Sequence, residues 1–228
     1  MKRINILTIF PEFFSGILTT GLIAKALAEK IVEINIINIR DYSEDKHKKV
    51  DDEPYGGGAG MVFKIEPIYN ALKKLNLLNK AEIILFSPIG KLLKQNDFKE
   101  LVKNDEIALI CGRYEGVDFR VAEHIATKIY SIGDYIIQGG EIAAAVLLEG
   151  FLRLVPGFVG NDESIKYESY EDNLLEYPQY TRPQNFNGWQ VPEVLLSGNH
   201  QLIKEWREKK RLELTKKYRN DLYNKYIN

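Results

Sequence analysis

The 228-residue sequence contains one cysteine, Cys111, and three scattered histidines. A single cysteine excludes an internal disulfide and is typical of a reducing compartment, so we expect a cytoplasmic location. Because no Cys-x-x-Cys or His-x-x-x-His spacing occurs, we expect no zinc site. Cys111 ends an apolar run with no histidine beside it, so we expect a buried side chain and not a nucleophile.

Long hydrophobic runs and a large net charge are also absent. No apolar run approaches the ~18 residues of a membrane-spanning helix, so we expect no membrane span. The apolar run 4–10 follows Lys2 and Arg3 as in a secretion signal, but Pro11 interrupts it and no cleavage site follows, so it predicts a strand. The net charge of −1 does not indicate a protein that coats nucleic acid.

The charge is nevertheless unevenly distributed. Residues 200–228 contain nine Lys or Arg and four Asp or Glu, a net charge of +5, so the rest of the chain carries −6. A basic tail on an acidic body indicates either an anionic partner or a helix face that is simply solvated. A helical pattern predicts a helix at 200–218, and we expect Trp189 and Trp206 in the core of this C-terminal part.

Apolar runs and helical patterns alternate along the first 155 residues. The runs predict strands at 4–9, 32–39, 82–86, 107–111 and 128–132. Helical spacing predicts helices that begin near Pro11 and Glu66, a helix around 98–102, and helices at 118–126 and 141–155, while Ser87–Gly90 is expected to turn. This alternation predicts an α/β fold with a mostly parallel sheet flanked by helices. The helix at 141–155 is apolar on nearly every side, so we expect all-round burial, within one large domain or partly against a second subunit.

Residues 40–60 form a long polar loop that ends in a glycine-rich stretch. Loops of this length bind something or are disordered. The stretch lacks the Gly-Lys-Ser/Thr of a phosphate-binding loop and a glycine of the dinucleotide fingerprint at Met61. It fits a hinged lid or a plain flexible turn.

Two further stretches, 111–118 and 131–141, break from apolar runs into glycines. Glycines there let backbone N–H groups approach a ligand closely, and ligands of open α/β sheets bind at such strand ends. For Arg113 and Glu115 two roles stay open, an ion pair with each other or a place at the mouth of the ligand site.

A series of motifs, in order and spacing, resembles the bacterial tRNA (guanine-N1)-methyltransferases, dimeric enzymes of the knotted SPOUT class. The resemblance covers nearly the whole chain. The motifs are Ile9-Phe-Pro-Glu12, Asp45-Lys-His47, Val50-Asp-Asp52, Pro54-Tyr-Gly-Gly-Gly58, Cys111-Gly-Arg-Tyr-Glu-Gly116, Ser131-Ile-Gly-Asp-Tyr135, Gly139-Gly-Glu141, Tyr180-Thr-Arg-Pro183 and Leu196-Ser-Gly198.

The resemblance implies a deep trefoil knot and a small helical C-terminal domain. It divides the chain into a knotted cofactor-binding domain at 1–158, a linker at 159–178 and a tRNA-binding domain at 179–228. The cofactor it implies is S-adenosylmethionine, and the sequence leaves open whether a divalent cation such as Mg²⁺ is needed. The implied cofactor-binding residues are Leu85, Phe86, Ser87, Pro88, Gly112, Tyr114, Glu115, Ile132, Gly133, Asp134, Tyr135, Ile136, Ile137, Gly139 and Gly140.

The resemblance also implies a homodimer with its active site at the subunit interface, and tRNA, not DNA, as the partner. The implied methyl acceptor is N1 of the guanine immediately 3′ of the anticodon. Arg153 and Glu168 take the catalytic positions; Glu168 is found by counting without gaps from Arg153 to Tyr180, where the family commonly has Asp. The implied tRNA contacts are Asp51, Tyr55, Gly58, Arg113, Glu176, Ser197 and His200.

The chain departs from the family at Glu53, Ala59, Ile89, Phe119 and Asn173. Glycine is common at the last position, and asparagine best tolerates the left-handed backbone among the other residues, so we expect the same turn. Two alternatives stay open, a SPOUT-class enzyme with another RNA target and a non-catalytic RNA-binding relative. A third alternative, an unrelated nucleotide-binding enzyme, is disfavoured because the chain lacks a phosphate-binding motif.

Overall fold

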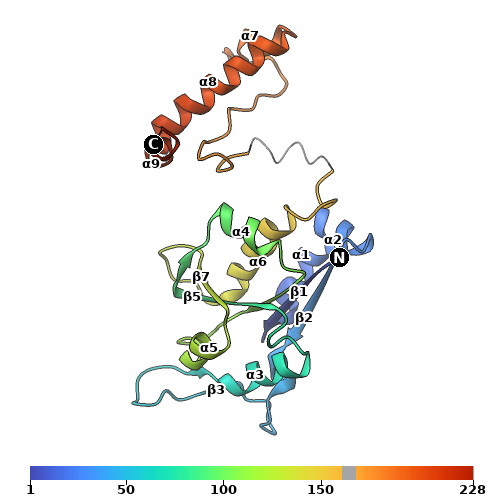
Figure 1. Cartoon of the computed structure of the whole chain (residues 1–228), viewed down its shortest axis with the longest axis vertical. Coiled ribbons are helices and arrows are strands. Elements are labelled where there is room, and N and C mark those ends of the chain that lie inside the picture. The colour runs from blue at the N-terminus through green and yellow to red at the C-terminus, as the bar shows by residue number, and fades with distance from the viewer. Residues whose placement is uncertain (161–167, 228) are drawn as a thin grey trace. The chain divides into compact units, whose positions relative to one another are not determined.

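A computed structural model describes residues 1–160 and 168–227 (Figure 1). The chain divides into two compact units, Met1–Gly160 and Asn161–Asn228, which are described separately. Of the linker predicted at 159–178, residues 161–167 lie outside the described residues, and residues 168–178 belong to the second unit.

A five-stranded sheet forms the centre of the first unit. Its order is β2-β1-β6-β5-β7, and every neighbouring pair is parallel. The strands are β1 (Lys2–Thr8), β2 (Val32–Asn38), β5 (Glu82–Leu92), β6 (Glu106–Ile110) and β7 (Lys128–Ser131). The predicted α/β fold with a mostly parallel sheet flanked by helices is therefore confirmed.

Helices cover both faces of this sheet (Figure 1). On one face lie α1 (Ser15–Thr19), α2 (Gly21–Ala28), α4 (Gln95–Leu101) and α6 (Gly140–Leu152), and on the other lie α3 (Ile65–Lys74) and α5 (Phe119–His124). Side chains alternate between the faces along a strand, so Ile4 and Ile6 belong to one buried cluster and Leu7 to the other. α6 leaves Ile142 and Val146 about half exposed, so the all-round burial predicted for it is not found in the described residues.

The path of β5 differs from the prediction. The expected turn at Ser87–Gly90 is wrong, because β5 runs through this segment with an irregularity in its pairing. Tyr130 of β7 pairs with Phe86 and again with Lys91. A Cβ on Gly90 would lie 2.6 Å from the backbone of Tyr130, so glycine permits the close passage of the two strands. Residues 87–89, which lie between the two pairs, line a cavity at this end of the sheet.

Two other regions contain more structure than expected. The helix predicted from Pro11 is broken into η1 (Pro11–Phe14), α1 and α2. Thr20, between α1 and α2, is extended, and Gly21, the first residue of α2, has a positive φ of 61°. The loop at 40–60 contains η2 (Ile39–Tyr42) and β3 (Asp51–Asp52), and β3 pairs with β4 (Val62–Phe63). The glycine-rich stretch between β3 and β4 extends away from the sheet (Figure 1).

The second unit contains a short hairpin and helices. They are β8 (Asn185–Phe186), β9 (Trp189–Gln190), α7 (Glu193–Leu196), α8 (His200–Tyr218) and α9 (Asn220–Ile227). The helix predicted at 200–218 is confirmed; it begins after Asn199, whose side chain accepts hydrogen bonds from the next backbone N–H groups. Trp189 is 74% exposed, so its predicted place in a core is wrong, whereas Trp206 is half-buried beside Tyr180. Asn173 has the expected positive φ, 63°.

Candidate active site

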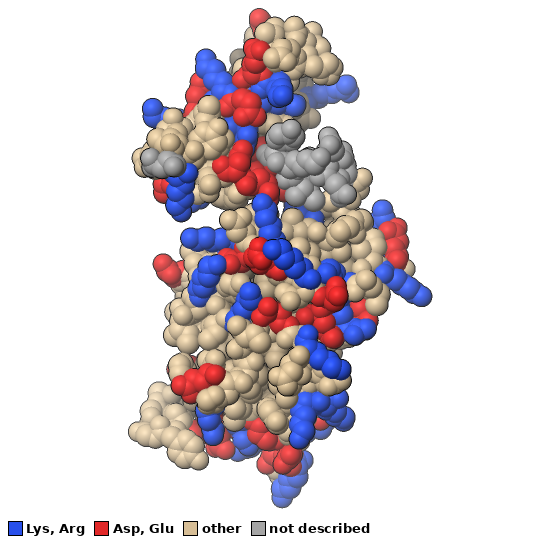
Figure 2. All heavy atoms as spheres, viewed as in Figure 1, with Lys and Arg blue, Asp and Glu red and all other residues tan. Residues whose placement is uncertain are grey.

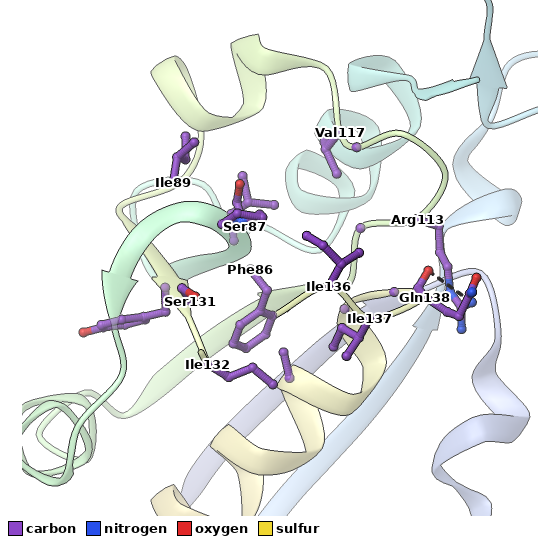
Figure 3. Close-up of a pocket in the computed structure, with 18 of the residues that line it drawn as sticks. Phe86, Ser87, Ile89, Arg113, Val117, Ser131, Ile132, Ile136, Ile137 and Gln138 are labelled. Carbon is purple, nitrogen blue, oxygen red and sulfur yellow. Dashed lines mark hydrogen bonds between the residues drawn. The ribbon is translucent and has the colours of Figure 1, made fainter. Parts of the chain in front are cut away.

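A cavity of about 360 Å³ lies at the carboxyl ends of β5, β6 and β7 (Figure 3). Most of its walls come from residues 85–89 in β5, 112–117 after β6, and 130–133 and 135–140 at the end of β7 and after it. The volume is within the range of roughly 300–1,000 Å³ that is usual for small-molecule sites. Strand ends of an open parallel sheet are where such ligands bind. The two glycine-containing stretches therefore meet at one site.

Glycine brings the start of α6 against the loop that follows β6. The N–H of Gly140 donates a hydrogen bond to the carbonyl oxygen of Gly112 at 2.8 Å. A Cβ on Gly140 would lie 2.8 Å from Cα of Cys111 and 2.9 Å from N of Gly112. Because these are backbone atoms, they cannot move aside as the end of a side chain can. Any other residue at position 140 would push the two walls apart.

The segment after β7 supplies an apolar wall. Figure 3 shows the side chains of Phe86, Ile132 and Ile137 gathered in one part of the cavity. The Tyr135 hydroxyl donates a hydrogen bond to the carbonyl oxygen of Ile132 at 3.1 Å, which holds this segment in a tight bend. Ile136 is 86% exposed. An apolar surface therefore lies partly inside the cavity and partly at its rim.

All but one of the predicted cofactor-binding residues line this cavity. They are Leu85, Phe86, Ser87, Pro88, Gly112, Tyr114, Glu115, Ile132, Gly133, Tyr135, Ile136, Ile137, Gly139 and Gly140. Asp134 is exposed and does not line it. The lining also includes Arg113 and residues that sequence reasoning missed: Ile89, Gly116, Val117, Phe119, Ala122, Tyr130, Ser131, Gln138 and Ala143. Most of the missed residues lie within or beside the recognised motifs, and that proximity was the available signal.

Arg113 and Glu141 form an ion pair at the edge of the cavity. Nε of Arg113 donates to Oε2 of Glu141 at 2.9 Å, and Oγ1 of Thr8 donates to Oε1 at 2.8 Å. Glu141 is fully buried, while the Arg113 side chain is 23% exposed and its guanidinium lies 4.7 Å from the ring centre of Phe10. The carboxylate partner of Arg113 is thus Glu141 and not Glu115. Glu141, a carboxylate in the first turn of an apolar helix, was the overlooked signal. A carboxylate is rarely buried unless it is paired, so its position indicated a charged or hydrogen-bonding partner.

Two titratable side chains beside the cavity are held neutral. Burial raises the pKa of the Cys111 thiol well above its usual value, and the Glu141 carboxylate adds to this effect. The predicted burial of Cys111 is confirmed. A protonated thiol is a poor nucleophile, which is consistent with the expectation that Cys111 is not one. Burial also raises the pKa of Tyr130 to about 12, and the carboxylates of Asp97 and Glu82 act in the same direction. The Tyr130 hydroxyl therefore stays protonated well above neutral pH.

The predicted tRNA contacts and catalytic residues are divided between the two units. In the first unit are Asp51 of β3, Tyr55 and Gly58 of the loop between β3 and β4, Arg113 at the cavity, and Arg153 just after α6; in the second are Glu168, Glu176, Ser197 and His200. Tyr55 is fully exposed. Arg153 lines a second surface cavity together with Phe13, Glu149 and Phe158. The structure thus brings the predicted cofactor-binding residues together at one cavity, whereas Arg153 and Glu168 belong to separate units.

Histidine, cysteine and carboxylate side chains are the usual ligands of metal ions in proteins. Among residues 1–160 and 168–227, no three or more of these side chains are grouped so that they could hold a metal ion. Within the same ranges, every helix is too short or too polar to cross a membrane.

Comparisons with known proteins agree with this geometry. The model of the family described as tRNA (Guanine-1)-methyltransferase TrmD matches residues 1–225. A tRNA (guanine-N(1)-)-methyltransferase from Acaryochloris marina is 52% identical over 226 residues, which cover 99% of this chain and 96% of the relative. Proteins of the same name from Trichormus variabilis and Clostridium tetani are 51% and 49% identical, and the matches cover 98% of this chain and 92% and 93% of the relatives. The chain therefore belongs to the tRNA (guanine-1)-methyltransferase family.

Proposed function

We propose that the chain transfers a methyl group from S-adenosylmethionine to N1 of the guanine immediately 3′ of the anticodon in tRNA. The observation that carries this proposal is the cavity at the ends of β5, β6 and β7, whose walls are the motifs shared with the family. The relatives' names supply the base and the atom. The position in tRNA follows from the resemblance, and tRNA as substrate fits the cytoplasmic location expected from the sequence.

The cavity fits S-adenosylmethionine in size and in character. Phe86, Ile132 and Ile137 offer an apolar surface suited to a flat adenine ring. The backbone at Gly112 and Gly140 has no Cβ that would keep a ribose at a distance. These residues would hold the cofactor.

The trefoil knot is part of this proposal. The resemblance assigns it to the loops after Leu85, Cys111 and Ile132, and these three segments line one cavity. The hydrogen bond from Gly140 to Gly112 ties the last loop to the second. Knots are otherwise nearly absent from proteins, so the crossing of the chain here would be a family-specific feature.

The chemistry requires a base, because N1 of guanine carries a proton and is a poor nucleophile until that proton leaves. S-adenosylmethionine, when bound, supplies an electrophilic methyl group. We assign to Glu168 the removal of the N1 proton and to Arg153 the stabilisation of negative charge that develops towards O6. Asp172, four residues after Glu168 in the sequence, is the first alternative base. Its carboxylate accepts hydrogen bonds from Arg211 at 2.5 Å and from the N–H of Leu174 at 3.3 Å within the second unit.

Transfer of a labelled methyl group tests the proposed activity. The chain is incubated with cofactor labelled in the methyl group and with a tRNA that has guanine 3′ of the anticodon. We expect label in this tRNA and none in a matched tRNA with adenine at that position. Label in ribosomal RNA but not in tRNA would indicate a SPOUT-class enzyme with another target. Binding of tRNA without any label would indicate a non-catalytic relative.

We further propose a homodimer whose active sites lie at the subunit interface. Ile142 and Val146 on α6 are 48% and 46% exposed. Residues at this spacing share a helix face with Glu149, and Arg153 follows on the same side. A half-exposed apolar stripe that leads to the proposed catalytic Arg153 is a surface that a second copy would cover.

Mixing two inactive variants tests whether the site is shared. Gly140→Val weakens cofactor binding, and Glu168→Ala removes the base. If each site takes its cavity from one subunit and Glu168 from the other, the mixed dimer has one site with both defects and one site with neither. We therefore expect methylation to reappear on mixing. Continued inactivity, with subunit exchange demonstrated by a tag on one variant, would contradict a shared site.

Exposed lysines of α8 are expected to contribute affinity for tRNA. Figure 2 shows basic side chains on the visible face of the second unit, interspersed with acidic ones. The exposed lysines are Lys204, Lys209, Lys216 and Lys217. Their replacement by glutamine should weaken tRNA binding and lower its salt dependence, by roughly 0.7–0.9 in the log–log slope for each phosphate that the protein no longer neutralises. Salt titrations of tRNA and cofactor binding measure both effects, and an equal weakening of both ligands would contradict this role.

A further inference from the structure

The buried side of α8 is polar. The residues of this helix that are buried are Arg211 and Thr215, at 3% and 0% exposure. The apolar positions from which the helix was predicted, such as Leu212 and Leu214, are only partly buried, and Leu202 is 48% exposed. Arginine is almost never fully buried unless it is paired. The burial of Arg211 therefore needs a specific explanation.

Arg211 and Thr215 both hold the chain segment at 172–175. Nη2 of Arg211 donates to Oδ1 of Asp172 at 2.5 Å, while Nη1 donates to Glu208 at 3.2 Å. One helical turn further on, Oγ1 of Thr215 accepts a hydrogen bond from the N–H of Leu175 at 2.8 Å. These hydrogen bonds join residues about 40 positions apart in the sequence. They fasten the segment to α8.

The fastened segment continues as a compact loop to Glu168. The N–H of Tyr170 donates to the carbonyl oxygen of Leu174 at 2.8 Å, and the N–H of Glu176 donates to Oγ of Ser169 at 2.9 Å. Leu174 is 1% exposed. The loop is thus closed on itself and anchored by a buried leucine. A shift of its attachment to α8 would move the backbone that carries Glu168.

A gain in folding stability does not explain the ion pair between Arg211 and Asp172. Nε of Arg211 is buried and makes no hydrogen bond to a described residue, which costs free energy. Replacement of a buried charge by an apolar side chain of similar volume is often neutral or stabilising. Asp172 and Glu208 are about half exposed, so water would solvate both carboxylates if the guanidinium were removed.

We propose that Arg211, through Asp172, is a positioning residue that sets the place of Glu168 in the active site. This inference rests on the proposed role of Glu168 as the base. Misplacement of a reacting group by about 1 Å can lower a rate by ~10²-fold, so a fastening of this kind affects the rate more than the binding of either ligand.

The test compares Arg211→Met with the wild-type chain in single-turnover methylation at saturating tRNA and cofactor. We expect the rate to fall by ~10- to 100-fold while the unfolding temperature stays the same or rises. Asp172→Ala should lower the rate similarly, and the double variant should be no slower than the slower single variant. In the Glu168→Gln background, Arg211→Met should have no further effect. Lys204→Met, which removes an exposed charge from the same helix, shows how much of any change in tRNA affinity is due to charge alone.

A folded Arg211→Met chain with the wild-type rate would overturn the inference, as would a rate loss that is equally large in the Glu168→Gln background. If Arg211→Met does not fold, Asp172→Ala decides the matter by the same comparison, because its side chain is half exposed. Failure of the base assignment is seen separately, as full activity of Glu168→Gln itself. Failure of the positioning role alone is seen as an inactive Glu168→Gln beside a normal Arg211→Met.

Discussion

Replacement of Glu168 by glutamine is expected to lower the rate of methyl transfer by about 10²- to 10⁴-fold, which corresponds to roughly 3–5 kcal/mol in the activation barrier. Glutamine keeps the shape and the hydrogen bonding of the side chain but cannot accept a proton as a carboxylate does. Single-turnover rates measured across the pH range test this expectation. Because the cofactor cavity is built from residues of the first unit, cofactor affinity should change little.

A matched control for this experiment is Glu193→Gln. Glu193 is an exposed carboxylate of the same unit, in α7, and its removal should leave the rate unchanged. Near-full methylation by Glu168→Gln at every pH would show that the base is elsewhere, and Asp172 would be the first carboxylate to examine. Arg153→Ala should also act mainly on kcat, since its proposed role is to stabilise charge in the transition state.

Gly140→Val is expected to weaken cofactor binding. The new side chain would begin 2.8 Å from Cα of Cys111 and 2.9 Å from N of Gly112, so the start of α6 and the loop after β6 must separate. Overpacking of this kind costs about 1–3 kcal/mol, or roughly 5- to 150-fold in affinity if the strain falls on the bound state. Calorimetric titration with S-adenosylmethionine measures the loss.

Gly16→Ala provides the control for the glycine substitution. Gly16 lies in α1, has no heavy atom within 4 Å of an added Cβ and does not adopt a positive φ. Alanine there should leave cofactor affinity unchanged and favour the helix slightly. Wild-type affinity in a folded Gly140→Val chain would contradict the assignment of the cavity as the cofactor site.

Local sequence patterns predicted what depends on neighbouring residues. The strands of the sheet, the helix α8 and the meeting of the glycine-containing stretches all follow from periodicity, strand ends and turn chemistry. The path of β5 past Ser87 did not, because its Ser-Pro-Ile-Gly sequence is typical of a turn and its irregular pairing depends on Tyr130 of a distant strand. Context that comes from far along the chain overrides local preference.

The burial of polar side chains could not be predicted from the sequence pattern either. Glu141 is buried because Thr8 and Arg113 satisfy its two oxygens, and Thr8 lies 133 positions away. In α8, the apolar positions suggested a buried stripe, yet Arg211 and Thr215 face inward because the 172–175 segment packs on them. A pattern of apolar residues cannot reveal such partners, since each of these hydrogen bonds joins segments that only the fold brings together.

The most direct test of the proposed function is to locate the methyl group on the RNA. tRNA that has been methylated by the chain with labelled S-adenosylmethionine is digested to oligonucleotides and then to nucleosides, and both are analysed by mass spectrometry. We expect 1-methylguanosine, and we expect it in the oligonucleotide that contains the guanine immediately 3′ of the anticodon. A methyl group on a ribose 2′-oxygen, on another base or at another position, or no methyl group at all, would contradict the proposed reaction.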